Sequence, residues 1–232
     1  MKILKFALLL SWSIGSNAKL MTDTIAQTLQ VPNNIAARLI ERMETIHQLN
    51  NRFALYYPIL TNVFLKPRGY KIGCEVGVFT GGHAEFILAN SNIEKLYCVD
   101  PYMVMDALSN ITEGFEEKYW NAAWETLYQY AADKLSAFGN RAELFRLTGA
   151  EAAAKIADHS LDFVFIDGDH SYLGVITDCT NYYDKVRSGG IISGDDYDLE
   201  QAGRAIRDFF GAKKLAINVY QGQTRFWWVE KP

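Results

Sequence analysis

Two hydrophobic patterns divide the chain near residue 70. Before that point, Ile35, Leu39 and Met43 recur at the spacing of one helix face, so residues 21–69 are predicted to be mainly helical. After it, short apolar runs alternate with stretches of helical periodicity. These runs predict strands at residues 71–76, 96–100, 144–147, 162–167, 190–195, 215–219 and 225–229.

The first five predicted strands are mostly continuous apolar runs, which are typical of a parallel sheet covered on both faces. The predicted helices lie at residues 82–90, 116–137, 150–157, 171–187 and 199–210. Only residues 221–223 separate the last two strands, which favours an antiparallel hairpin. We therefore predict an α/β fold with a Rossmann-like, seven-stranded, mostly parallel sheet, helices on both faces and a C-terminal antiparallel hairpin. The expected single domain spans residues 21–232, with the sheet in residues 70–232.

Residues 1–20 have the layout of a secretory signal peptide. Lys2 and Lys5 precede an apolar run over residues 6–14, and Ser16-Asn17-Ala18 follows as a small-x-small pattern. This run is too short to span a bilayer as a helix. The alternatives are an amphiphilic N-terminal helix and an extension before a true start at Met21.

The composition of the 232 residues excludes a disordered or low-complexity chain, since 49% are hydrophobic and 22% are charged. The net charge of −4 provides no general attraction to nucleic acid or anionic lipid. Three widely spaced cysteines, Cys74, Cys98 and Cys179, form neither a disulfide framework nor a CxxC metal site. We interpret the first two as buried thiols.

A glycine-rich turn follows the first predicted strand and runs from Glu75 through Gly77 to Gly81. Phe79 stands where a G-x-G-x-x-G dinucleotide fingerprint needs its second glycine, and no Lys-Ser/Thr pair follows to make a P-loop. The second predicted strand ends in Asp100, a position suited to binding the two hydroxyls of a ribose. Together these features indicate a nucleoside cofactor without phosphates.

Acidic side chains end the fourth and fifth predicted strands. Asp167, Asp169 and His170 follow one strand, and Asp195 and Asp196 follow the other. One helix connects these strands, so they are expected to be neighbours about 4.8 Å apart, with their carboxylates converging. Clustered carboxylates repel one another unless a cation compensates, which indicates a divalent metal, most naturally Mg²⁺.

These residues resemble the class I S-adenosylmethionine-dependent methyltransferases over residues 70–230. The resemblance implies that Gly77 and Gly81 lie under the methionine part of the cofactor, that Glu75 lies near its amino group, and that Asp100 holds its ribose. The remaining residues that it implies for the cofactor site are Thr148, Gly149 and Ala150 beside the adenine, and Asp167. His83, at the start of the following helix, faces either the cofactor or solvent.

The segment Ile166-Asp-Gly-Asp-His-Ser-Tyr172 is similar to a narrower group that includes macrolide-sugar and aminocoumarin-sugar O-methyltransferases. In the metal-dependent members, the matching positions imply Asp167, Asp195 and Asp196 as metal ligands and Asp169 as general base. His170 is a rival base, because its intrinsic pKa suits proton transfer near neutral pH.

The expected function is therefore metal-assisted O-methylation of a hydroxyl on a small molecule or sugar, with no nucleic-acid or membrane partner. A homo-oligomer is left open. One alternative is a metal-dependent hydroxylase resembling the cephalosporin hydroxylase group, and another is a non-catalytic S-adenosylmethionine-binding module. S-adenosylmethionine is made inside cells, so a cytoplasmic location is expected, with export or membrane association through residues 1–20 as the alternative.

Overall fold

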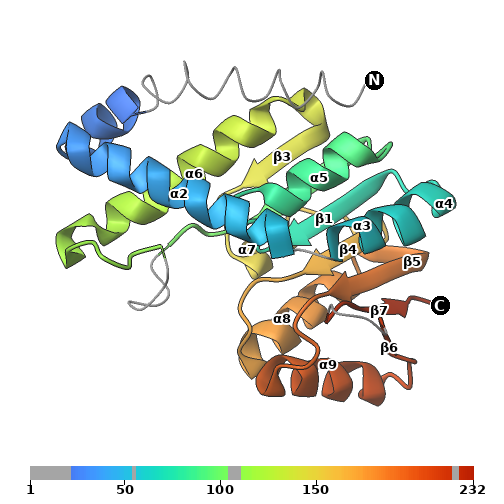
Figure 1. Ribbon diagram of the computed structural model, residues 1–232. Helices are drawn as coiled ribbons and strands as arrows, with labels where there is room; N and C mark the ends of the chain where they lie inside the picture. The colour runs from blue at the N-terminus through green and yellow to red at the C-terminus, as the bar shows by residue number, and fades with distance from the viewer. Residues whose placement is uncertain (1–21, 54–55, 104–110, 221–224) are drawn as a thin grey trace.

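The computed structural model contains one sheet with the strand order β3-β2-β1-β4-β5-β7-β6 (Figure 1). It describes residues 22–53, 56–103, 111–220 and 225–232. The parallel strands are β1 (Ile72–Val76), β2 (Lys95–Val99), β3 (Ala142–Phe145), β4 (Leu161–Ile166) and β5 (Val186–Gly194). The antiparallel strands are β7 (Trp227–Glu230), paired with β5, and β6 (Asn218–Val219) at the edge. This arrangement confirms the predicted Rossmann-like α/β fold.

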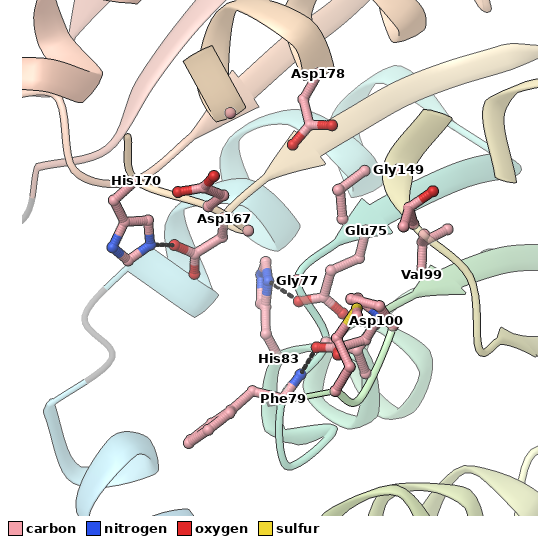
Figure 2. A pocket seen from close by; sticks show the side chains of 18 of the residues that line it. Glu75, Gly77, Phe79, His83, Val99, Asp100, Gly149, Asp167, His170 and Asp178 are labelled. Carbon is pink, nitrogen blue, oxygen red and sulfur yellow. Dashed lines mark hydrogen bonds and ion pairs between the residues drawn. The ribbon is translucent and has the colours of Figure 1, made fainter. Parts of the chain in front are cut away.

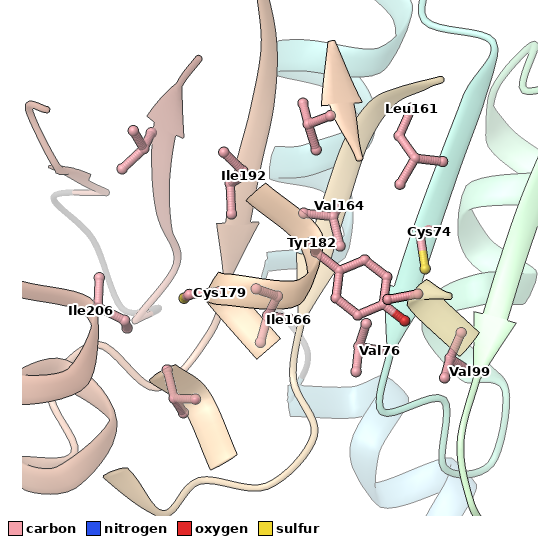
Figure 3. Close-up of a cluster of buried hydrophobic side chains, with 14 of the residues drawn as sticks. Cys74, Val76, Val99, Leu161, Val164, Ile166, Cys179, Tyr182, Ile192 and Ile206 are labelled. Atoms are coloured by element: carbon pink, nitrogen blue, oxygen red, sulfur yellow. The ribbon is translucent and has the colours of Figure 1, made fainter. Parts of the chain in front are cut away.

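Helices cover both faces of the sheet, which explains why the strands are continuously apolar. The helices that follow the strands are α5 (Gly82–Asn90), α6 (Trp120–Ser136), α7 (Gly149–Ala153), α8 (Tyr172–Tyr183) and α9 (Glu200–Ala212). On β4, Val164 and Ile166 pack with the cluster beneath α7, α8 and α9 (Figure 3), while Phe163 and Phe165 pack with the opposite cluster beside α5. All three cysteines are buried free thiols.

Several element boundaries differ from the sequence prediction. β3 begins two residues earlier than expected, at Ala142, because it lies at the sheet edge with every residue only half-buried. β5 begins at Val186, four residues early, because Val186 pairs with Leu161 before a shift in register. α8 ends correspondingly early, at Tyr183.

The N-terminal part of the chain adds helices beside the sheet. Residues 22–29 are helical, and they precede α2 (Asn33–Phe53), α3 (Tyr56–Ile59), the π-helical turn η1 (Leu60–Leu65) and α4 (Lys66–Arg68). Figure 1 shows α2 lying across α5 and α6. Leu39 and Met43 of α2 share a buried cluster with Leu127 of α6, so the predicted helix face forms this contact.

Two sequence predictions fall on residues outside the described part of the chain: the segment 1–20 and the turn at 221–223. Among the described residues, none of the helices combines the length and the hydrophobicity needed to cross a bilayer.

Asp162 connects the starts of three strands, and its removal is expected to be costly. Its carboxylate accepts hydrogen bonds from the backbone N–H groups of Lys71 (2.6 Å) and Ile72 (2.8 Å) and from Nε of Arg187 (2.7 Å). We expect Asp162→Ala to lower the free energy of unfolding by about 2–3 kcal/mol, because hydrogen bonds to a charged group are lost. Urea unfolding measures this, and a loss below about 0.5 kcal/mol would contradict it.

The same contacts predict a pH dependence of stability. Burial opposes ionisation of Asp162, but the hydrogen bonds from Ile72, Lys71 and Arg187 outweigh it and hold its pKa below the ordinary value of 3.8. The stabilisation is therefore fully present above the unfolded-state pKa and is lost as the pH falls through the lower folded-state pKa. The difference in stability between wild type and Asp162→Ala should shrink below about pH 4.

Candidate active site

The carboxyl ends of β1, β2 and β4 form the wall of a cavity of about 740 Å³ (Figure 2). Val76, at the end of β1, pairs with Val99 of β2 and Ile166 of β4. The next residue of each strand, namely Gly77, Asp100 and Asp167, lines the cavity, as do Gly149 and Ala150 at the start of α7. The fold thus brings together the strand ends that the sequence singled out.

The glycine-rich turn is held by close backbone contacts. Gly77 has φ +92°, and a Cβ atom there would lie 2.0 Å from the carbonyl oxygen of Asp167, so only glycine fits. Gly81, with φ +77°, is the N-cap of α5 and is not among the residues that line the cavity. Its predicted place under the methionine part of a cofactor stays a prediction.

Asp100 is fixed by the turn that it faces. Its Oδ2 accepts the N–H of Phe79 and its Oδ1 accepts the N–H of Tyr102, both at 2.9 Å. Burial raises the pKa of Asp100, although these backbone hydrogen bonds favour the carboxylate. The carboxylate is therefore oriented at the cavity wall before any ligand arrives.

Glu75 and His83 form a buried pair at another part of the wall, with Nδ1 of His83 2.9 Å from Oε1 of Glu75. Burial raises the pKa of Glu75. Oε2 of Glu75 and Nε2 of His83 are buried and have no hydrogen-bond partner among the described residues. Because both residues line the cavity, His83 faces it and not solvent.

Two tyrosines of α3 close this side of the cavity, and sequence reasoning missed both. Tyr56 donates its hydroxyl to Oδ2 of Asp167 at 3.1 Å and stacks on Phe165, and Tyr57 stacks on His83. Both tyrosines lie in an apolar stretch of the sequence next to Pro58. No local pattern links an N-terminal tyrosine to the end of β4, so only the fold reveals this contact.

An acidic cluster lies beside the cavity. Asp167, His170 and Asp196 each offer one ligand atom, and these atoms lie within 4.8 Å of one another. Nε2 of His170 is 3.1 Å from Oδ2 of Asp196 and 3.5 Å from Oδ1 of Asp167, and the contact with Asp167 raises the pKa of His170. Arg225 contacts the other oxygen of Asp196 at 2.9 Å.

This cluster of three includes His170, predicted only as a base, and does not include Asp195, whose role as a metal ligand stays a prediction. Oδ1 of Asp195 is buried without a hydrogen-bond partner among the described residues. Burial, with Asp167 nearby, raises the pKa of Asp195 to about 6. Oxygen donors and one imidazole suit a divalent ion, and an unpaired buried carboxylate oxygen is what a cation would satisfy, so the residues present fit the predicted metal.

Asp169 lies at the cavity wall and is also tied to α8. Its two oxygens accept hydrogen bonds from the N–H and the hydroxyl of Ser171, both at 2.9 Å. A Cβ atom on Gly174 would lie 2.5 Å from the Asp169 carboxyl group. The carboxylate is thus held in one orientation at the cavity, as a base needs to be.

Comparison with protein families identifies the family of this chain. Residues 71–197 match the model of a family described as a methyltransferase domain. The chain belongs to this methyltransferase family. The match runs from β1 to the residue after Asp196, so it includes the glycine-rich turn, Asp100 and both acidic strand ends.

One known protein is a relative of this chain by sequence. The uncharacterized protein R132 of Acanthamoeba polyphaga mimivirus is 30% identical over 127 residues, which are 53% of this chain. The match spans about half of that protein (50%).

Solved structures show the same fold at low identity. An O-methyltransferase from Bacillus cereus in complex with SAH is 14% identical with a TM-score of 0.53, over 82% of this chain and 89% of that one. A spermidine synthase in complex with the transition state analogue AdoDATO is 22% identical with a TM-score of 0.50, over 77% of this chain and 59% of that one.

S-adenosylmethionine is the cofactor expected of a methyltransferase of this family, and the cavity fits it. The unpaired Oε2 of Glu75 suits its ammonium group, and the fixed carboxylate of Asp100 suits two ribose hydroxyls.

Asp100→Ala is expected to weaken S-adenosylmethionine binding by roughly 10–150-fold, because a charge-assisted contact worth about 1.5–3 kcal/mol is lost. Calorimetric titration measures the change, with circular dichroism to verify the fold. Asp158→Ala, an exposed aspartate that does not line the cavity, is the control and should bind like wild type. Unchanged affinity in Asp100→Ala would remove Asp100 from the ribose site.

Proposed function

We propose that this methyltransferase transfers the methyl group of S-adenosylmethionine to a hydroxyl oxygen of a small molecule or sugar, with assistance from a divalent metal. The observation that carries the proposal is the position of Asp167. This residue lines the cofactor-sized cavity and also belongs to the cluster with His170 and Asp196. The acceptor and the methyl donor would therefore meet at one residue.

Asp167 and Asp196, together with Asp195 or His170, would hold the metal, and this ion would lower the pKa of a bound acceptor hydroxyl. Other residues of the chain hold two of these carboxylates in position. Tyr56 orients Asp167 through its hydroxyl, and Arg225 orients Asp196. Holding acceptor and donor in line supplies most of the rate enhancement expected of a methyl transfer.

Two residues are candidates for accepting the hydroxyl proton. Asp169 lines the cavity with a fixed carboxylate, and His170 lies next to it with its ring in contact with Asp167 and Asp196. In the proposed step the hydroxyl proton moves to one of these residues and the oxygen bonds to the methyl carbon. The carbon–sulfur bond breaks, its electron pair stays on sulfur, and S-adenosylhomocysteine leaves.

The hydroxylase alternative receives no support from the described residues. An iron oxygenase site prefers two histidines and one carboxylate. The cluster found in the described part of the chain contains one histidine, and the nearby His83 is instead buried in its pair with Glu75. Binding of the cofactor alone does not require the clustered Asp167 and Asp196 or the fixed carboxylate of Asp169. Their presence therefore disfavours a non-catalytic binding module.

The proposed reaction needs S-adenosylmethionine, so the proposal includes action in the compartment where this cofactor is made. A test of the reaction is incubation of the protein with methyl-labelled S-adenosylmethionine and extracts of small molecules and glycans. We expect label in a product whose new methyl group is bonded to oxygen, as shown by NMR of the purified product. Label bonded to nitrogen or carbon would contradict O-methylation.

A further inference from the structure

The glycine-rich turn contains a residue in a backbone conformation that costs energy. Phe79 has φ +53°, in the left-handed region that non-glycine residues rarely adopt. Such a conformation persists only where the surrounding structure fixes it. Oδ2 of Asp100 accepts the N–H of Phe79 at 2.9 Å (Figure 2), and the hydroxyl of Tyr102 donates to the carbonyl oxygen of Phe79 at 3.1 Å. The turn is therefore held on one side by residues that follow β2.

A second support of the turn comes from α2. Nδ1 of His47 lies 3.2 Å from Oγ1 of Thr80, the residue after Phe79. Thr80 is 2% exposed and lines the cavity, whereas His47 is not among the residues that line it. Helix α2 also precedes residues 71–197, which match the methyltransferase family. A helix outside the matched part of the chain thus reaches the cavity wall through one imidazole ring.

Two charged side chains hold the ring of His47 from its other nitrogen. Nζ of Lys134, on α6, lies 3.2 Å from Nε2 of His47 and 3.3 Å from Oε2 of Glu85, on α5. Burial, and then the charge of Lys134, lower the pKa of His47 to about 4, so the ring is neutral near pH 7. The neutral ring therefore lies between the glycine-rich turn and a mostly buried ion pair.

These partners determine the direction of both hydrogen bonds of the ring. An ammonium group only donates, so Nε2 of His47 accepts from Lys134. The single proton of a neutral imidazole then lies on Nδ1, and Nδ1 donates to Oγ1 of Thr80. The hydroxyl oxygen of Thr80 is thereby held in place by a donor that belongs to α2.

We propose that His47 is a positioning residue of the cofactor site, which fixes the glycine-rich turn through the hydroxyl of Thr80 and so strengthens the binding of S-adenosylmethionine without touching it. This inference rests on the proposed function, because it takes S-adenosylmethionine as the ligand of the cavity. A turn that is already fixed loses less conformational freedom when the ligand binds, and the affinity rises accordingly. Helix α2 then forms part of the functional unit together with the sheet.

The experiment is a double-mutant cycle on the affinity for S-adenosylhomocysteine, measured by calorimetric titration. His47→Phe keeps a ring and removes both nitrogens, and it should weaken binding by about 3–10-fold, as expected for the loss of one hydrogen bond. Thr80→Val keeps the shape of the side chain and removes the hydroxyl. In a Thr80→Val background, His47→Phe should change the affinity by less than about 1.5-fold, because its partner is already absent.

Two further variants and one spectrum complete the experiment. His47→Asn is the conservative variant, because its amide nitrogen takes about the place of Nδ1 and can donate to Thr80, so its affinity should stay within about twofold of wild type. His159→Phe, at an exposed histidine that does not line the cavity, is the control and should bind like wild type. Nitrogen NMR of the wild-type protein should show the His47 ring proton on Nδ1.

The cycle separates positioning of the turn from a general structural role. A purely structural histidine acts whether or not the Thr80 hydroxyl is present, so equal losses from His47→Phe in both backgrounds would overturn the proposal. A loss in His47→Asn as large as that in His47→Phe, or a wild-type ring with its proton on Nε2, would also overturn it. Each of these results leaves the proposed function standing. Failure of wild type to bind S-adenosylhomocysteine at all would overturn both.

Discussion

Gly77→Ala is expected to lower the free energy of unfolding by about 2–5 kcal/mol, the largest stability effect that we predict for a single methyl group. The backbone at Gly77 has φ +92°, which costs a non-glycine residue about 1–2 kcal/mol. The added Cβ would also lie 2.0 Å from the Asp167 carbonyl oxygen, a backbone atom that moves only if β4 moves. Such overpacking costs a further 1–3 kcal/mol or so, and no side-chain rotation relieves it.

Gly81→Ala is the matched control, because Gly81 shares the positive φ (+77°) but not the collision. The nearest atom to its added Cβ is Cδ of Lys134 at 3.5 Å, an ordinary contact. We expect a loss of about 1–2 kcal/mol in Gly81→Ala. Urea unfolding of both variants without cofactor measures the difference. Equal losses in the two variants would show that the close approach of β1 and β4 at Gly77 does not constrain the fold.

Asp196→Asn is expected to lower turnover by at least about 100-fold, since the substitution keeps the size of a proposed metal ligand and removes its charge. It should weaken Mg²⁺ binding and leave the affinity for S-adenosylmethionine within about twofold, because Asp196 does not line the cofactor cavity. Asp198→Asn is the control. Asp198 also contacts Arg225, but it is exposed and lies outside the cluster. Unchanged Mg²⁺ affinity in Asp196→Asn, measured by calorimetry, would remove this residue from the metal site.

Asp169→Asn is expected to behave differently from Asp196→Asn. Mg²⁺ should remain bound while turnover falls by about 10²–10⁴-fold, the range expected for loss of a general base. Full activity in Asp169→Asn together with loss of activity in His170→Ala would transfer the role of base to His170 and leave the metal proposal in place.

The overall fold could be predicted from the sequence because its strongest determinant is local. A strand covered on both faces must be apolar at every position, as β4 is from Phe163 to Ile166, and this pattern stands out from the amphipathic helices around it. The edge strand β3 is half-buried throughout, so its apolar pattern is weak and its predicted position was two residues late.

Some residues of the candidate site could be predicted from the sequence and others could not. Gly77, Asp100 and Asp167 directly follow strands, so the rule that ligands bind at the carboxyl ends of a parallel sheet was enough to select them. Tyr56 and Asp178 reach the cavity from helices, and their neighbours in the sequence resemble ordinary helical core and surface. Their positions at the cavity depend on how α3 and α8 pack in the fold, which no local pattern encodes.

The measurement that tests metal-assisted methyl transfer most directly is turnover as a function of added Mg²⁺ after exhaustive chelation. The assay follows the label from S-adenosylmethionine to the hydroxyl acceptor found in the extracts. Transfer should stop after chelation and return as Mg²⁺ is added, with Asp196→Asn requiring more Mg²⁺ than wild type. Transfer at the full rate after chelation would contradict the metal role, and the absence of transfer to any hydroxyl at saturating Mg²⁺ would contradict the proposed reaction.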